Sequence, residues 1–156
     1  MTQTGLIKHN IARTYALLGG GKTIRKPLRN LLDAHDALIA GLPTSALLHL
    51  QSKVPLLATD DALEKVIGIS AKALRRRKID ASEIALSTEQ SNRTWTFTEI
   101  LLRTTDVLGA QAEAEAWLNR PAIGLDRRRP IDLLCTAAGV DAVEDYLTRI
   151  EYGVYA

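Results

Sequence analysis

Apolar residues recur three and four positions apart over most of this chain, which is the period of an amphipathic α-helix. Leu63 and Ile67 form one such pair, and Ile100, Leu101 and Leu108 mark the apolar side of a longer segment. Many of the apolar residues are Ala and Leu, which favour helices because they lose little side-chain freedom there. The predicted helices span residues 6–18, 27–40, 43–51, 59–68, 70–78, 87–109, 110–119, 130–138 and 141–152. The pattern therefore predicts an all-α fold.

Two of these helices have clear start signals. Thr59 supplies a hydroxyl cap, and the two aspartates after it lie beside the positive end of the helix that follows. Ser87 and Gln90 have the spacing of a capping box, which opens the helix that ends at Gly109. Within that helix, residues 94–98 alternate polar and aromatic side chains and taken alone indicate a short strand. The cap upstream and the helical spacing downstream favour a helix.

Charge divides the chain into two unlike halves. Residues 1–78 contain 13 Lys and Arg against 5 Asp and Glu, whereas residues 79–156 contain 7 against 13. The basic half is the candidate for binding a polyanion such as nucleic acid, and the alternative is two halves that attract each other or stay soluble. The single cysteine, the absence of a signal-peptide pattern and the lack of an 18-residue apolar run predict a cytoplasmic protein with no membrane span.

Residues 60–78 fit a helix-turn-helix. Gly68 provides the turn, Ile69 fills it, and Leu74 anchors the second helix to the first. We expect Lys72 and Arg76 to face the major groove, with Ala73 and Arg77 beside them. Arg75 and Lys78 are expected to contact backbone phosphates. Ser70 is expected to cap the helix. The alternative is a solvated basic helix. One position departs from the usual motif, because Glu64 stands where such motifs have a small residue.

The chain carries no constellation that predicts catalysis. The segment Gly19–Thr23 lacks the first glycine of a phosphate-binding loop, since Ala16 occupies that position, and no parallel sheet is predicted to hold it. It is interpreted as a basic turn. The three histidines have no metal-ligand spacing with one another or with Cys135, which we place in the core of an apolar helix. We therefore expect no catalytic residue, metal or cofactor, and a protein that is not an enzyme.

The C-terminal segment has the most specific pattern. A loop with the basic run Arg127–Arg129 joins two helices, and this run is either a second phosphate contact or is paired with nearby acids. On the last helix Val143 and Leu147 form a buried stripe that reaches Ile150. Tyr146, Arg149 and Tyr152 then lie partly outward, and Gly153 ends the helix before a short apolar tail.

These residues carry a family resemblance. The order Ala116-Trp117-Leu118, Pro121, Leu125, Arg129–Leu134, Val143, Leu147 and Arg149–Tyr155 closely resembles the antitoxins of the RES–Xre toxin–antitoxin systems, the Xre/ParS-like family. The resemblance covers roughly residues 44–156 and leaves residues 1–40 unmatched. It implies an Xre-like helix-turn-helix domain, which represses its own operon, and a small helical toxin-binding domain. It also implies a partner RES toxin that depletes NAD⁺ and whose active site the antitoxin covers.

Carried over by position, the family's Arg-Pro-hydrophobic-Asp-Leu-Leu motif falls on Arg129–Leu134 and its tail on Arg149–Ala156. Relatives often have a glycine where this chain has Asp126. The resemblance implies that the final helix and tail occupy the toxin's NAD cleft, with Tyr152 and Tyr155 as aromatic contacts. The expected toxin-binding residues are Tyr146, Arg149, Ile150, Tyr152, Gly153, Val154, Tyr155 and Ala156.

The resulting organisation has three parts. We expect a basic N-terminal helical segment at 1–42, a helix-turn-helix domain at 43–86 and a toxin-binding domain at 87–156. The expected partners are a RES-domain toxin, operator DNA and a second copy of the chain, in a homodimer or a larger complex with toxin. The alternative function is a plain helix-turn-helix regulator whose C-terminal half only dimerises.

Deletion of residues 153–156 is expected to weaken or abolish toxin neutralisation without changing the fold, because it removes the tail and spares the predicted core. Growth of cells that co-express the toxin measures neutralisation, and far-ultraviolet circular dichroism of the purified chain measures helix content. Full protection by the truncated chain would contradict a role for the tail.

Overall fold

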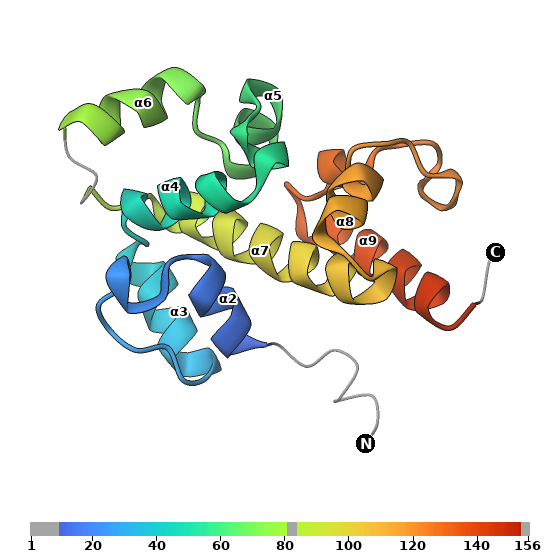
Figure 1. Ribbon diagram of the computed structural model, residues 1–156, viewed down its shortest axis with the longest axis horizontal. Coiled ribbons are helices and arrows are strands. Elements are labelled where there is room, and N and C mark those ends of the chain that lie inside the picture. The colour runs from blue at the N-terminus through green and yellow to red at the C-terminus, as the bar shows by residue number, and fades with distance from the viewer. Residues whose placement is uncertain (1–9, 81–83, 154–156) are drawn as a thin grey trace.

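Helix α7, Thr88–Leu108, is the axis on which the other helices pack (Figure 1). The computed structural model describes residues 10–80 and 84–153, and over these ranges the chain forms helices and turns but no sheet, which confirms the all-α prediction. Both halves of the predicted capping box are present, since Ser87 accepts from the Gln90 N–H at 3.0 Å and Gln90 accepts from the Ser87 N–H at 3.1 Å. Gly109 ends the helix with φ at 96°.

The strand-like segment within α7 is helical because its threonines are satisfied by the helix itself. Thr94 and Thr98 are fully buried, and each hydroxyl donates to the carbonyl four residues earlier at 2.8 Å, as Thr104 does further along α7 at 2.7 Å. Phe97 is completely buried and Trp95 nearly so. Tertiary packing on several sides of α7 therefore overrides the strand preference of these residue types.

The N-terminal elements are α2 (Ile11–Leu17), η1 (Gly20–Lys22), α3 (Leu31–Ala40) and α4 (Thr44–Lys53). Of these elements, α2 and α3 pack on α7. The helix that was predicted from residue 27 begins only at Leu31, because the side chain of Asn30 accepts from the Asp33 N–H at 2.8 Å and caps the helix there. The predicted basic turn at residues 19–23 is a short 3₁₀ turn. The first residues of the predicted helix 6–18 lie outside the described residues.

Three elements follow α4 and precede the long helix. They are η2 (Pro55–Ala58), the continuous pair α5 (Asp60–Ala62) and η3 (Leu63–Ile67), and α6 (Ala71–Asp80). A buried hydrogen bond from the Leu42 N–H to Ser91 Oγ, 2.8 Å long, ties the segment just before α4 to α7. None of the buried side-chain nitrogen and oxygen atoms among the described residues lacks a hydrogen-bond partner.

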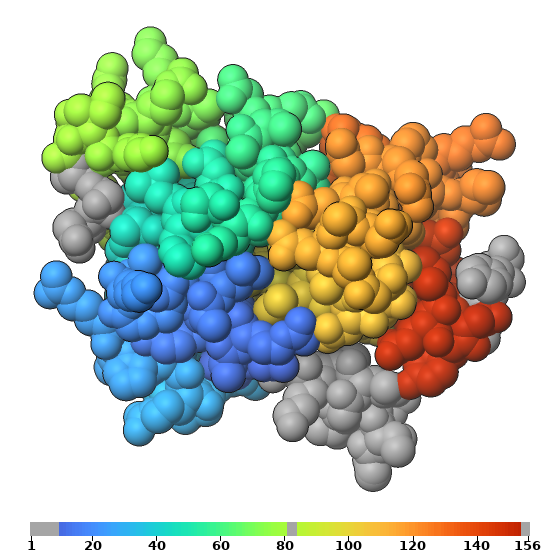
Figure 2. All heavy atoms as spheres, in the orientation of Figure 1, coloured from blue at the N-terminus to red at the C-terminus, as the bar shows by residue number. Residues whose placement is uncertain are grey.

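The C-terminal elements are α8 (Gln111–Leu118), η4 (Ile123–Leu125), η5 (Pro130–Leu133) and α9 (Ala137–Glu151), and they pack around the far end of α7 (Figures 1 and 2). Val143 and Leu147 of α9 are completely buried. In Figure 2 the N-terminal elements and the C-terminal ones occupy opposite sides of the molecule. No helix in the described ranges is both long and apolar enough to cross a bilayer.

Two predictions near residue 135 were wrong. The expected helix 130–138 is instead a 3₁₀ turn, Pro130–Leu133, whereas the expected helix 141–152 is present as α9 but begins earlier, at Ala137. The hydroxyl of Thr136 accepts from the Gly139 N–H at 3.0 Å and starts α9 there, and Gly139 lies so close to the Leu133 carbonyl that a Cβ would collide with it. Cys135 was expected in the core, but it is exposed in the turn between η5 and α9.

Candidate functional site

The α5–η3 and α6 pair has the predicted helix-turn-helix arrangement. Thr59 Oγ1 accepts from the Ala62 N–H at 3.2 Å and caps the first helix. Gly68 makes the turn with φ at 86°, a left-handed conformation that glycine adopts without strain. Ile69 and Leu74 are 4% and 2% exposed, so the turn and the second helix are fixed to the core.

The unusual Glu64 is accommodated by the backbone. Residues Leu63–Ile67 form one π-helical turn, in which the Gly68 N–H bonds to the carbonyls of both Leu63 and Glu64, at 3.3 and 3.0 Å. Such a turn holds one residue more than an α-helical turn, so the inward positions shift. Leu63, Val66 and Ile67 are completely buried while Glu64 is exposed. The acidic side chain therefore does not enter the helix-turn-helix core.

Helix α6 presents a basic surface. Lys72, Arg75, Arg76 and Lys78 are all exposed. The other three predicted DNA-contacting residues have structural roles. Arg77 is half-buried and donates to Thr44 Oγ1 at 3.3 Å. Ala73 packs against the core, and the hydroxyl of Ser70 accepts from the Ala73 N–H at 3.0 Å as the helix cap.

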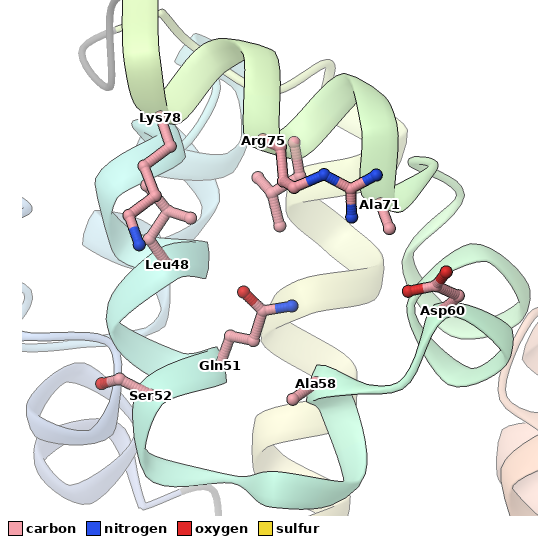
Figure 3. A pocket seen from close by; sticks show the side chains of 9 residues that line it. Leu48, Gln51, Ser52, Ala58, Asp60, Ala71, Arg75 and Lys78 are labelled. Carbon is pink, nitrogen blue, oxygen red and sulfur yellow. The ribbon is translucent and has the colours of Figure 1, made fainter.

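A groove runs between α4 and α6 beside this basic surface (Figure 3). Arg75 and Lys78 of α6 lie on one side of it and Gln51 and Ser52 of α4 on the other. Its remaining lining is apolar apart from Asp60. Sequence reasoning missed Gln51 and Ser52, because nothing in the local pattern of α4 indicates that its last turns face α6.

An ionic network joins the helix-turn-helix to the C-terminal half. The guanidinium of Arg129 donates to Asp132 through Nε and Nη2, both at 2.9 Å, to Asn119 Oδ1 at 3.0 Å, and to Asp61 of α5 at 3.3 Å. Lys65 of η3 lies 3.5 Å from Asp61 and 3.6 Å from Asp132. We call these five residues the Arg129 network. Each half of the chain contributes one acid and one base to it: Asp61 and Lys65 come from the helix-turn-helix, and Asp132 and Arg129 come from the C-terminal half.

The network changes the protonation equilibria of its members. Hydrogen bonds to Asp132 and then Asp61 raise the pKa of Arg129 above its ordinary value. The hydrogen bond from Arg129 is the main cause that lowers the pKa of Asp132, and the charges of Arg129 and Lys65 act in the same direction. Arg129 and Asp132 side chains are 28% and 32% exposed, so water screens this pair less than a surface pair.

The basic run in the loop before η5 is therefore not one uniform patch. Asp126 and Arg127 both have left-handed backbone conformations, with φ at 57° and 65°. Asp tolerates this region better than most residues, so it can stand where relatives often have glycine. Arg128 pairs with Asp126 at 3.3 Å and Arg129 belongs to the network, whereas Arg127 has no ion pair among the described residues. The interpretation that acids pair with this run is correct for two of its three arginines.

The outer side of α9 carries the expected protein-binding residues. The ring of Tyr146 stacks on Trp117 of α8 with centroids 5.8 Å apart, and Arg149 pairs with Asp145 at 2.8 Å. Ile150 is half-buried, and Tyr152 is 54% exposed at the helix end. Gly153 has φ at 70°, so the chain leaves the helix axis there. Val154, Tyr155 and Ala156 lie outside the described residues.

The described residues offer no group of three or more His, Cys, Asp and Glu side chains that could hold a metal ion. The candidate site is thus made of two surfaces, the basic side of α6 and the outer side of α9. The Arg129 network lies on the side of the molecule where η3 meets η5. Both surfaces are suited to binding another macromolecule.

Comparisons with known proteins match two segments of the chain, each to one family model. Residues 33–97 match the family model of the antitoxin Xre-like helix-turn-helix domain, and residues 103–153 match that of the antitoxin Xre/MbcA/ParS C-terminal toxin-binding domain. A curated relative, Antitoxin Xre of Yersinia enterocolitica serotype O:8 / biotype 1B, is 28% identical over 110 residues, which cover 70% of each chain. The first match contains α6, and the second contains α9.

The substitution Asp132→Asn is expected to lower the melting temperature near neutral pH, because it weakens the Arg129 network. A carboxylate with a lowered pKa stabilises the fold above the ordinary pKa of aspartate, and that contribution is lost as the pH falls through the lowered value. The difference between wild type and variant should therefore shrink on acidification. Thermal melts followed by circular dichroism across this pH range measure it.

Asp126→Asn is the matched control, because Asp126 is 86% exposed and its pair with Arg128 should contribute little. A melting-temperature difference for Asp132→Asn that stays constant from neutral to acidic pH would contradict the role given to its charge.

Proposed function

We propose that this chain, an Xre-family antitoxin with a helix-turn-helix domain and a C-terminal toxin-binding domain, neutralises a RES-type toxin that depletes NAD⁺. It does so by covering the toxin's active site with α9 and the residues that follow it. Through α6 it binds operator DNA and represses its own operon. Its action in both cases is binding, and it needs no cofactor.

The observation that carries the toxin-binding proposal is the exposed aromatic end of a firmly held helix. Val143 and Leu147 fix α9 to the core, and Tyr146 stacks on Trp117, so the helix is ordered before any partner arrives. Tyr152 projects from its last turn with 54% of its surface exposed. A large side chain held in place by a rigid element binds with little loss of conformational entropy, which is typical of interface hot spots.

The proposed inhibition is steric. The turn at Gly153 directs the chain away from the axis of α9, so residues after it can enter a cleft while the helix rests on the cleft's edge. Tyr152 offers a ring that buries well and a hydroxyl that keeps a hydrogen bond. Ile150 and Arg149 extend the same contact along α9. NAD⁺ would then be excluded from the toxin.

Expression of the reading frame adjacent to the gene for this chain is expected to collapse intracellular NAD⁺, as a RES-type toxin would, and co-expression of this chain is expected to prevent the collapse. An enzymatic cycling assay on cell extracts measures NAD⁺. Leu147→Asp, which places a charge at a fully buried position of α9, should lose protection, whereas Arg76→Ala should keep it. An unchanged NAD⁺ level on toxin expression would overturn the toxin's identity and favour the plain regulator.

Support for operator binding comes from the exposed cations of α6. Lys72 and Arg76 lie four residues apart on the side opposite the buried Leu74, which is the side a recognition helix turns to the major groove. Arg75 and Lys78 flank them at the groove lined by Gln51 and Ser52, where a phosphate backbone would pass. The proposed readers are thus Lys72 and Arg76, and the other cations hold the DNA in place.

Arg76→Ala is expected to weaken operator binding by roughly 1–3 kcal/mol and to relax sequence preference, because arginine reads guanine with two hydrogen bonds. Fluorescence anisotropy with operator and scrambled duplexes, at fixed salt, measures both effects. Arg120→Ala, an exposed arginine in the segment that precedes η4, removes the same charge and should change binding little. An unchanged isotherm for Arg76→Ala would exclude α6 as the reader.

We also propose the domain organisation that the sequence indicated, with residues 43–86 for DNA and 87–156 for toxin, and to the basic segment 1–42 we now assign the association of two copies. A repressor of a palindromic operator acts as a dimer. Helix α3 of the N-terminal segment exposes Leu31, Leu32 and Ile39, by 54%, 74% and 59%, which supports this assignment. Larger complexes with toxin follow if each copy of the dimer binds one.

A further inference from the structure

The turn between α8 and η5 is a rigid, projecting structure. The Ala122 N–H donates to the Arg128 carbonyl at 3.1 Å, and the Arg127 N–H donates to the Ala122 carbonyl at 2.8 Å, so the two ends of the turn are fastened together. Leu125 is 7% exposed and anchors it to the core. In Figure 1 this orange segment extends beyond α8 at the edge of the molecule. We call residues 122–128 the projecting turn.

Ile123 is displayed on the projecting turn. It is 87% exposed, the largest exposed fraction of any large apolar residue in the described part of the chain. Leu125, two residues further on, shows that the turn can bury an apolar side chain. A single exposed isoleucine is not unusual, but one held on a fastened turn is preorganised for contact.

The projecting turn rests on α9, the helix that we propose covers the toxin's active site. Gly124 lies against the ring of Tyr146, so closely that a Cβ at this position would collide with it. Tyr146 is a half-buried residue of α9 that packs against the core and is stacked on Trp117. The contact between Gly124 and Tyr146 therefore fixes the projecting turn, with the exposed Ile123, directly against α9.

Charge at the projecting turn indicates what kind of surface it fits. Arg127 is exposed and has no ion pair among the described residues, while Arg128 is paired with Asp126. The turn thus presents an exposed apolar side chain, Ile123, and four residues later a positive charge, Arg127, that is unpaired among the described residues. A complementary surface would have an apolar pocket with carboxylates at its rim.

We infer that Ile123 and Arg127 form a second contact with the toxin, apart from the end of α9, in which Ile123 fills an apolar pocket and Arg127 meets carboxylates at its edge. This inference rests on the proposed function, since the occupant is the toxin neutralised by α9. The projecting turn lies within residues 103–153, which match the toxin-binding domain, and it packs on the proposed toxin-binding helix. An exposed isoleucine would gain little from a DNA backbone, so toxin is the better occupant.

The test is a binding measurement with the full-length chain and full-length toxin by isothermal titration calorimetry. Ile123→Ser is expected to weaken toxin binding at least about tenfold, as truncation of an interface anchor does. Ile79→Ser is the matched control, because Ile79 is 83% exposed on α6, and it should leave toxin binding unchanged. Thermal melts verify that both variants fold, which is expected because neither side chain contributes to the core.

A second variant tests the charge. Arg127→Asn removes the cation while keeping a residue that tolerates the left-handed backbone, and it should slow association with toxin and reduce its salt dependence. Arg25→Ala, an exposed arginine of the N-terminal segment, serves as its control. Rates from surface plasmon resonance at several salt concentrations measure the effect.

The outcomes separate this inference from the proposed function. Tight binding of toxin by the wild-type chain and equally tight binding by Ile123→Ser would overturn the second contact and leave the proposed function intact. Loss of operator binding by Ile123→Ser, with toxin binding unchanged, would overturn it in favour of DNA as the occupant. No binding of the RES-type toxin by the wild-type chain would overturn both.

Discussion

The Arg129 network is the interaction on which the relation between the two functional surfaces depends. A single guanidinium satisfies Asp132 and Asn119 in its own half and reaches Asp61 in the helix-turn-helix. Lys65 of the helix-turn-helix makes a second ion pair between the halves, with Asp132. The opposite net charges of the two halves would attract each other without any fixed geometry. The hydrogen bonds of this network instead fix the relative position of the two halves. A planar group with several donors in fixed positions suits that task better than an ammonium would.

Local signals predicted the elements that depend on local contacts. The caps at Thr59 and Ser87 and the turn at Gly68 involve residues within three or four positions of one another, and all three are present. Two helix starts were missed although local caps set them, Asn30 for α3 and Thr136 for α9. The start of α9 also depends on the space that the Leu133 carbonyl leaves for Gly139, and no propensity scale contains that contact. The exposure of Cys135 follows from the same shift.

Some features of the candidate surfaces could be predicted from local sequence, and others depend on contacts between distant residues. The cations of α6 could be predicted because a helix with one buried Leu74 has a defined outward side. The groove beside them required α4, and the position of Arg129 in a network required Asp61, which precedes it by 68 residues. Arg129 belongs to the motif that the resemblance assigned to the toxin-binding domain, yet its side chain is occupied within the molecule. Sequence therefore identified the residue, and only the structure gives its contacts.

Helix α7 has a consequence for how this chain can change over generations. The helix-turn-helix match ends at residue 97 and the toxin-binding match begins at residue 103, and both positions lie within the same unbroken helix. One inserted or deleted residue between them would turn everything beyond it by about 100° around the helix axis. It would also separate Asp61 from Arg129. Substitutions in either half would therefore leave the relative orientation of the two halves unchanged, whereas a change of length between residues 97 and 103 would alter it.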